Sequence, residues 1–382
     1  MPYYHGLKGY STDKADWISR RLIALRWDLH NQIVRDRQPN SLIIGSWNLR
    51  AFDGGLLRLD DSYHYIAEII GAFDICAIQE IKSDLEPLKR LVRLLGEKNW
   101  AYFVTDITDH VGGNDERMAF VYNTDKVFFR NLVGEIVVDE SKLPHGQQLA
   151  RSPFFAAFQA GWFRFTLVSA HIFFGKDDAA SKKIRSEEIR LIGDKLLYRA
   201  KREDQVYIFL GDMNIDKKDG VVMQSLKDTD MEVPIFDASN MDGKKYYDQM
   251  AYTVKGASTR KTRRLRHGTF DWRRAVYPYK GTQIHVSEDD SNFVPDPSNV
   301  FRPNFNESTA YYFAAHKHHR QRYNKTVSAS KRVSIKKNLT AFRSGFGTWS
   351  THQMSDHLPI WLELETDYSE QYLARFHNLD QS

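Results

Sequence analysis

The residues best suited to chemistry lie directly after a short apolar stretch in the middle of the chain. Val206–Leu210 is too short and too rich in β-branched and aromatic side chains for a helix, and we predict a buried strand. Gly211 ends it, and Asp212 and Asn214 follow two positions apart, so alternation along an extended backbone points both side chains the same way. Such a pair can hold a divalent cation or orient an attacking water, although an acid and an amide at this spacing also form plain turn caps.

Polar side chains with similar chemical potential lie at the ends of other predicted strands. Asn48 ends an apolar run that begins at Ser41, Glu80 follows the run Phe73–Ile78, and His171 follows Phe163–Ala170. Asp248 lies in the extended segment 244–252, and Asp356 with His357 precedes the strand 360–364 and indicates an acid/base pair. One such residue is compatible with a structural role. Their recurrence at strand ends indicates one site assembled from several strand termini.

Helical patterns separate these strands. Apolar residues at helical spacing predict helices over 13–37, 63–71, 85–95, 182–199 and 223–227, and the stretches 100–106 and 117–123 predict a hairpin with a long tip. We expect residues 1–40 to form a helix packed on the main body; a partner-binding helix is the alternative. The main domain is expected over 41–365, with an insert at about 253–350 and a tail over 366–382.

Composition indicates a globular protein with one strongly basic segment. The chain has 382 residues and a net charge of +5, yet residues 251–350 carry 19 Lys and Arg against 6 Asp and Glu, which leaves the remainder at −8. A basic segment on an acidic protein indicates a polyanionic partner. No apolar run is long enough to span a bilayer, no signal-peptide pattern is present, and Cys76 has no second cysteine to pair with. We therefore expect a cytoplasmic protein; the sequence indicates no protein partner.

Six short motifs occur in the order and rough spacing typical of one superfamily. They are Trp47-Asn48, Gln79-Glu80, Ser169-Ala170-His171, Gly211-Asp212-Met213-Asn214, Tyr247-Asp248-Gln249 and Ser355-Asp356-His357. With them, residues 41 to 365 resemble the endonuclease/exonuclease/phosphatase superfamily, the family of deoxyribonuclease I, and look most like its bacterial cytoplasmic members. The resemblance implies an α/β (α+β) four-layer sandwich, in which two packed mixed β-sheets are flanked by helices and the site lies at one end.

The resemblance also implies roles for individual residues. Glu80, with Asn48 beside it and Asp356 as a further acid, resembles the metal-binding set, and Mg²⁺ suits such oxygen ligands, with Mn²⁺ as the second choice. Asp212 and Asn214 resemble the pair that positions the attacking water and the phosphoryl oxygen. His357 resembles the proton acceptor that Asp248 orients, and His171 resembles the histidine that contacts a non-bridging oxygen or the leaving group, with Asp106 as its expected partner. Arg151 resembles a phosphate-gripping arginine.

The resemblance and the composition favour a metal-dependent nuclease that hydrolyses phosphodiester bonds in DNA, with RNA as a second polymer. The alternative is a phosphatase or phosphodiesterase acting on inositol phosphates or phospholipid head groups; a non-catalytic binding module is least favoured. The insert departs from the family pattern, and its cations and interleaved aromatics predict a nucleic-acid-binding arm, with contacts from Arg263, Arg264 and Arg266. A solvated basic loop is the alternative. His316, His318 and His319 lack a nearby acid or cysteine, which disfavours a zinc site.

Overall fold

A computed structural model describes residues 2–52, 58–107, 115–138, 149, 151–203, 205–254, 262–278, 306–315 and 345–377. The helices are η1 (His5–Gly9), α1 (Thr12–Leu29), the π-helical turn η2 (His30–Val34), α2 (Asp60–Ile70), α3 (Glu86–Leu95), α4 (Ala179–Arg202), α5 (Val221–Lys227), η5 (Trp272–Arg274), a helix over 306–315, α8 (Phe346–Gln353) and α9 (Ser369–His377). The strands are β1 (Ser41–Phe52), β2 (Ile75–Ile81), β3 (Trp100–Val104), β4 (Arg117–Asn123), β5 (Phe128–Glu135), β6 (Phe154–Ala160), β7 (Phe163–His171), β8 (Val206–Asp212), β9 (Asp248–Tyr252), β10 (Arg264–Thr269) and β11 (Ile360–Glu365).

The strands form two mixed sheets. One has the order β10-β11-β1-β2-β4-β3 and the other the order β5-β6-β7-β8-β9. β1 pairs parallel to β2 and β7 parallel to β8, whereas the other pairings are antiparallel. A parallel pair places the carboxyl ends of both strands at the same edge of its sheet. The polar residues near the carboxyl ends of β1 and β2, and those at the carboxyl ends of β7 and β8, are therefore brought together in pairs.

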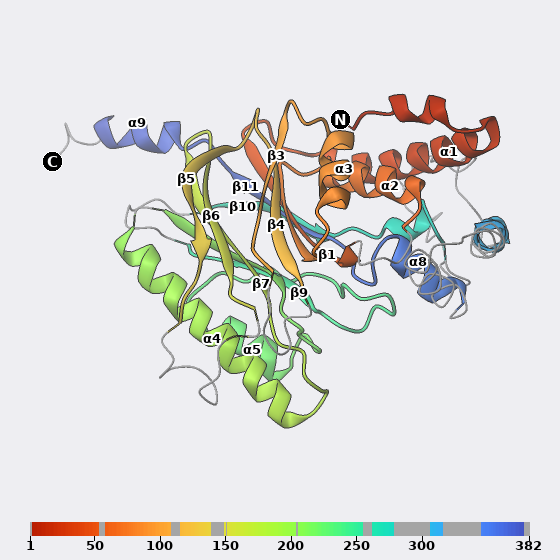
Figure 1. Ribbon diagram of the computed structural model, residues 1–382. Helices are drawn as coiled ribbons and strands as arrows, with labels where there is room; N and C mark the ends of the chain where they lie inside the picture. The colour runs from red at the N-terminus through yellow and green to blue at the C-terminus, as the bar shows by residue number, and fades with distance from the viewer. Residues whose placement is uncertain are drawn as a thin grey trace, which may run out of the picture.

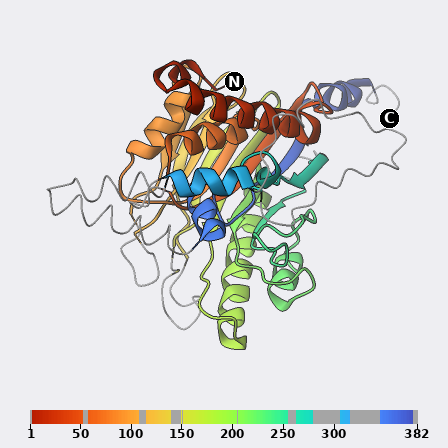
Figure 2. The same ribbon diagram turned by 90° about the vertical axis from the view of Figure 1, so that its right-hand side faces the viewer.

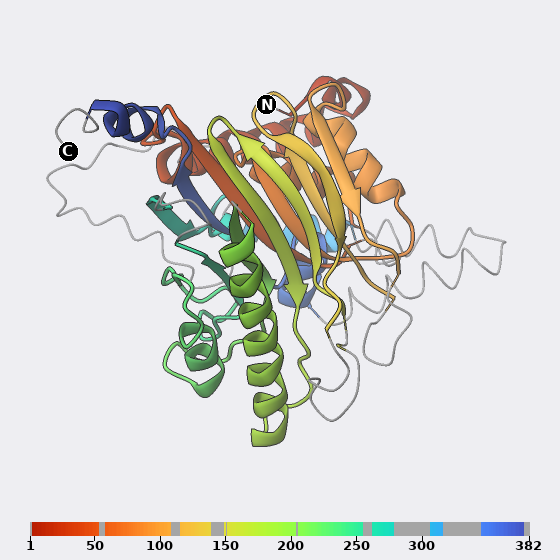
Figure 3. The ribbon, with the colours of Figure 1, turned by 90° about the vertical axis from the view of Figure 1, so that its left-hand side faces the viewer.

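Strand alternation builds the layers shown in Figures 1 and 3, with α1, α2 and α3 on the outer face of one sheet and α4 and α5 on the outer face of the other. In β1, Leu42 and Ile44 join the core between the sheets, whereas Ile43 and Trp47 join the core under the helices. In β8, Ile208 faces the other sheet and the neighbouring side chains pack under α4. The expected four-layer sandwich is confirmed.

Residues 253–350, which we expected to form one basic insert, contribute several elements to the body of the fold. β10 is an edge strand antiparallel to β11. Trp272 and Tyr277 are fully buried and Tyr312 nearly so, all within the core under the helices. These three aromatic side chains therefore stabilise the fold, and the expectation that they stack on bases is wrong. Figure 2 shows the helix over 306–315 beside α8. The other cationic clusters of the insert and the three histidines lie outside the described residues.

The three arginines proposed for nucleic-acid contact lie on or directly before β10, and each is paired with a carboxylate. Arg266 contacts the buried Glu363 at 2.6 Å. The other two pairs are Arg263 with Glu365 at 3.3 Å and Arg264 with Glu232 at 3.6 Å. Because β10 runs antiparallel to β11, these arginines lie at the end of β11 that is farther from His357. The structure does not bring them to the catalytic end of the sheets.

The N-terminal helix packs on the same core as the first sheet. Ile18, Leu22 and Leu25 of α1 are buried in the cluster that contains residues of α2 and α3. Trp17 stacks on Tyr311 of the helix over 306–315, with ring centroids 4.4 Å apart. Among the described residues, no helix is long and apolar enough to cross a membrane.

Candidate active site

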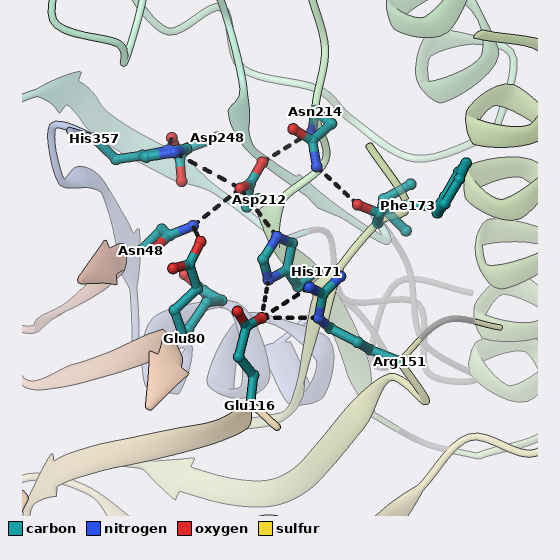
Figure 4. Close-up of polar contacts among 12 residues, drawn as sticks. Asn48, Glu80, Glu116, Arg151, His171, Phe173, Asp212, Asn214, Asp248 and His357 are labelled. Atoms are coloured by element: carbon teal, nitrogen blue, oxygen red, sulfur yellow. Dashed lines mark hydrogen bonds and ion pairs between the residues drawn. The ribbon is translucent and has the colours of Figure 1, made fainter. Parts of the chain in front are cut away.

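The polar residues at the strand ends converge in one cluster (Figure 4). The two sheets supply them from opposite sides: Asn48 and Glu80 lie near the carboxyl ends of the first sheet's parallel pair, and His171 and Asp212 end the second sheet's parallel pair. Each sheet thus contributes half of the site. The packing of one sheet on the other brings the halves together.

The close approach of β7 and β8 places His171 beside Asp212. The two residues are register partners, as are Ala170 and Gly211 one position earlier. Gly211 has φ +133°, and a Cβ there would lie 2.0 Å from the carbonyl oxygen of Ala170. Only glycine fits this conformation and this contact. The Gly-Asp pair is therefore a steric requirement for setting the carboxylate next to the imidazole.

Irregular backbone turns the first sheet's residues toward the site. The pairing of β1 with β2 shifts register between Asn48 and Phe52, and that of β2 with β4 shifts between Ile78 and Ile81. Glu80, inside this interval, has φ +62°, a left-handed conformation that is costly for a residue with a side chain. β-bulges of this kind redirect side chains near active sites. The strained Glu80 is held where it meets the second sheet.

Two carboxylates meet at one amide. Asn48 Nδ2 donates to Glu80 Oε1 at 2.8 Å and to Asp212 Oδ2 at 3.0 Å. Ligand atoms of Glu80, His171 and Asp212 all lie within 4.8 Å of one another. Like charges this close are stabilised by a cation, and carboxylate and amide oxygens are the ligands that hard divalent ions prefer. The residues therefore fit a divalent metal, with Asp212 in the group.

Asp248 and His357 form a tight buried pair. His357 Nδ1 lies 2.7 Å from Asp248 Oδ2, and its Nε2 lies 3.8 Å from Asp212 Oδ2. Burial alone would lower the pKa of His357, but the charges of Asp248 and Asp212 and the hydrogen bond to Asp248 raise it well above its usual value. Trp47 Nε1 donates to the carbonyl oxygen of His357 at 2.9 Å and fixes its backbone.

His171 has a different partner from the one expected. Its Nε2 lies 3.4 Å from Asp212 Oδ2, and its Nδ1 lies 3.4 Å from Glu116 Oε2. Asp106 is 94% exposed and contacts Arg117 instead, so the expectation that it supports His171 is wrong. Glu116, directly before β4, was missed because it reads as part of a polar hairpin tip. The available signal was a carboxylate just before the apolar run 118–121, which resembles the other polar residues at strand ends.

Glu116 gathers cations around His171. It contacts Arg151 Nη2 at 2.8 Å and Lys82 Nζ at 3.1 Å. Burial alone would raise the pKa of Glu116, but the hydrogen bond and charge of His171 and the charges of Arg151 and Lys82 lower it to about 2. The structure thus brings Arg151 to the site, as part of this buried ion cluster. A small pocket lined by Glu80, Glu116, Arg151 and His171 opens beside it.

The remaining predicted residues lie around this cluster, and each contacts residues of its own half of the site. Asn214 donates through Nδ2 to the carbonyl oxygen of Ile172 at 2.7 Å, and its backbone N–H donates to Asp212 Oδ1 at 3.0 Å. Asp356 lies at the rim, 41% exposed, with Oδ2 3.5 Å from Arg50 Nε. It is not among the ligand atoms grouped around Glu80.

Arg58 links the end of β1 to the loop that carries His357. The buried guanidinium donates to the carbonyl oxygens of Gln353 at 2.9 Å, Leu49 at 2.8 Å and Met354 at 3.2 Å. Ser355 Oγ also donates to the carbonyl oxygen of Asn48 at 2.5 Å. Two segments 300 residues apart are thereby fixed against each other. No sequence motif indicated a role for Arg58.

The two sheets thus bring together carboxylates that fit a divalent metal and two imidazoles on either side of Asp212. The model of the endonuclease/exonuclease/phosphatase family matches residues 45–325, and the chain belongs to this family. It is therefore a phosphoester hydrolase, and enzymes of the family generally depend on a divalent metal.

One solved structure has the same fold, and others are similar at lower scores. The chain is similar to an endonuclease/exonuclease/phosphatase family protein from Bacteroides thetaiotaomicron, with 17% identity and a TM-score of 0.50 over 86% of this chain and 99% of that chain. It is also similar to D. rerio TDP2 complexed with single-strand DNA product, with 12% identity and a TM-score of 0.48 over 85% and 98%. A mannosyl-6-phosphatase from Bacteroides thetaiotaomicron has 18% identity and a TM-score of 0.46 over 60% and 89%. No curated protein matches the sequence.

Proposed function

We propose that the protein is a divalent-metal-dependent phosphodiesterase, a nuclease that hydrolyses phosphodiester bonds of DNA, and also of RNA, by in-line attack of water. One observation carries the proposal: the carboxylate of Asp212 lies between the imidazoles of His171 and His357, at 3.4 and 3.8 Å. Phosphodiester cleavage requires a proton to leave the attacking water and a proton or hydrogen bond to reach the leaving oxygen. Two imidazoles on opposite sides of one acid suit these two tasks.

His357 is the residue proposed to take the proton from water. The ionised Asp248, 2.7 Å from Nδ1, keeps a hydrogen on that nitrogen, so Nε2, on the side of Asp212, is the atom proposed to exchange the proton. Because the charges of Asp248 and Asp212 also raise the pKa of His357, Nε2 must lose its own proton before it can accept one from water, and a metal held by Asp212 would favour that loss by offsetting the acid's charge. Asp212 and Asn214 orient the water and a phosphoryl oxygen, and the hydrogen bond from Asn214 to Ile172 fixes the amide. A protonated His357 is neutralised by the acid beside it, which limits the cost of charge in a buried site.

His171 and Arg151 are proposed to serve the phosphate. His171 Nε2 faces the same carboxylate from the other side, where a donor can hold a non-bridging oxygen or protonate the leaving oxygen. Glu116 sets the orientation of both side chains because it contacts each of them. Glu80 and Asp212 are the proposed ligands of Mg²⁺ or Mn²⁺, and Asn48, whose Nδ2 donates to both carboxylates, lies beside them. Asp356, at the rim and outside this group, is proposed as a further acid on the metal side. A bound metal neutralises negative charge that develops on the phosphoryl oxygens.

The test is hydrolysis of plasmid DNA, single-stranded DNA and RNA with Mg²⁺, Mn²⁺ or a chelator. We expect metal-dependent cleavage by the parent and a loss of about 10²- to 10⁴-fold in His171→Ala, with a comparable loss in Asp212→Asn. Glu86→Gln, which removes an exposed carboxylate remote from the site, is the matched control and should retain parental activity. Absence of cleavage of every polymer by folded protein would refute the nuclease and direct the assay to inositol phosphates and phospholipids.

A further inference from the structure

An exposed aromatic ring lies at the mouth of the proposed active site. Phe174 is 46% exposed, three residues after His171. Its ring meets Tyr247 edge to face, with centroids 6.3 Å apart and an interplanar angle of 88°. Tyr247 precedes Asp248, and its ring centroid lies 5.6 Å from that of His357. The two rings therefore form a continuous aromatic path from solvent to the proposed base.

The backbone of the Phe174 loop is held on both sides of the ring. Phe173 N donates to Glu188 Oε2 at 3.1 Å, and Lys176 N donates to Ser181 Oγ at 2.9 Å. Gly175 turns the chain at φ +62°, where a Cβ would come within 2.5 Å of Phe173. An exposed phenyl group on a loop with this many fixed contacts loses little conformational freedom when it binds something flat.

Arg185 supports the ring from within. Its buried guanidinium lies 5.6 Å from the Phe174 ring centroid and donates to the carbonyl oxygens of Lys176 at 3.2 Å and Asn214 at 2.6 Å. One side chain thus fixes both the aromatic loop and the loop that carries a proposed catalytic amide. The position of the ring relative to the site is therefore set by the Arg185 guanidinium, which contacts the ring and donates to both loops.

The loop that carries Lys245 and Tyr247 is joined to the other two loops by an ion pair and a backbone hydrogen bond. Asp177 contacts Lys245 at 3.5 Å and Lys182 at 2.8 Å. Met213 N donates to the carbonyl oxygen of Tyr247 at 2.8 Å. The aromatic corner of Phe174 and Tyr247 is therefore built on three loops that are joined to one another and to the catalytic residues.

We propose that Phe174 and Tyr247 form a stacking platform for an unpaired base next to the scissile phosphate, which makes single-stranded nucleic acid the preferred substrate. This rests on the proposed nuclease function. Phe174 and Tyr247 are two rings, whereas a membrane-binding surface needs a contiguous apolar patch, and the exposed Lys176 and Asp177 follow Phe174 closely in the chain. Aromatic faces bordered by cations are how proteins bind unpaired bases without sequence preference. A paired base in a duplex does not offer its face in this way.

The experiment compares kcat/KM for the parent, Phe174→Ala and Phe174→Trp on a mixed-sequence single-stranded oligonucleotide, the matching duplex, and a polymer of abasic deoxyribose phosphate units. We expect the parent to prefer the single strand. Phe174→Ala should lower kcat/KM on it by roughly 5- to 150-fold, the range that corresponds to one base stack, mainly through KM. Phe174→Trp should restore most of this loss. On the abasic polymer, kcat/KM should be the same for the parent and for both variants. Phe128→Ala, which removes a ring 66% exposed on β5, is the matched control and should behave as the parent.

Equal loss by Phe174→Ala on the abasic polymer would overturn the platform, because the ring would then only support its loop. Parental activity of Phe174→Ala on the single strand would also overturn it. A loss of activity by Phe174→Ala that is confined to mannose 6-phosphate or an inositol phosphate would assign the ring to binding a sugar and would overturn it as well. In each of these cases cleavage of polymer by the parent still supports the nuclease. Failure of the parent to cut any polymer refutes the proposed function itself.

Discussion

Replacing Glu116 by Gln tests the contact with His171, which the sequence analysis assigned to Asp106. The substitution keeps the shape of the side chain and removes its charge. Arg151 and His171, both nearly buried, would then lose the carboxylate that each contacts. We expect Glu116→Gln to lower both the activity and the free energy of unfolding, and Asp106→Asn to change neither, because Asp106 is 94% exposed.

Two estimates of the loss in stability agree. The pKa of Glu116 is about 2 in the folded protein against 4.5 for a free carboxyl, and this difference corresponds to about 3 kcal/mol at pH 7. Removing one partner of a buried ion pair costs about 3–5 kcal/mol. For activity, losing a carboxylate that orients a functional imidazole costs roughly 10- to 100-fold.

The sign of the pH dependence gives a second check. A depressed carboxyl pKa contributes stability that is complete above about pH 4.5 and is lost as the pH falls towards 2. Urea denaturation in chelator should therefore show the parent more stable than Glu116→Gln at pH 7, with the difference shrinking below pH 4.5. A variant as stable and active as Asp106→Asn, or a difference that does not depend on pH, would refute the reasoning.

Three further predictions concern other parts of the molecule. Arg58→Gln should lower kcat/KM by roughly 10- to 100-fold, because the carbonyl oxygens of Leu49 and Gln353 lose their common donor, and added guanidinium should restore part of it; no rescue would count against the positioning role. Burial, with the charge of Arg90, lowers the pKa of His64 to about 4. As the pH falls, the unfolded chain therefore protonates His64 before the folded chain does, and His64 should lower the free energy of unfolding of the parent by about 3 kcal/mol between pH 6.5 and 4. His64→Gln should lose less over that interval in urea denaturation, and identical pH profiles would contradict the assignment. Glu80→Gln should weaken Mn²⁺ binding measured by calorimetry while thermal stability in chelator is retained; unchanged affinity would exclude Glu80 as a ligand.

The sequence determined where the strands run and which polar residues stand at their ends. A continuous apolar run is a local property, since a strand that faces two cores must be apolar on both faces, and such runs located β1, β2, β7 and β8 to within a few residues. One polar residue at the end of a buried strand can have a structural role, but the recurrence of such residues at several strand ends indicates a shared site. Asn48, Glu80, His171 and Asp212 could therefore be found without the fold, and the structure places all four together.

Only the tertiary structure decided which groups meet across those strand ends. Asp106 and Glu116 flank the same hairpin tip and are equivalent in sequence terms, but the bulged pairing of β2 with β4 and the packing of the two sheets bring only Glu116 to His171. The sequence places Arg266 in a basic cluster, but the structure pairs it with Glu363, which lies nearly 100 residues later in the neighbouring strand and neutralises its charge. Spacing along a chain fixes positions within one strand. Contacts between strands depend on register and on how the layers pack, which nothing local encodes.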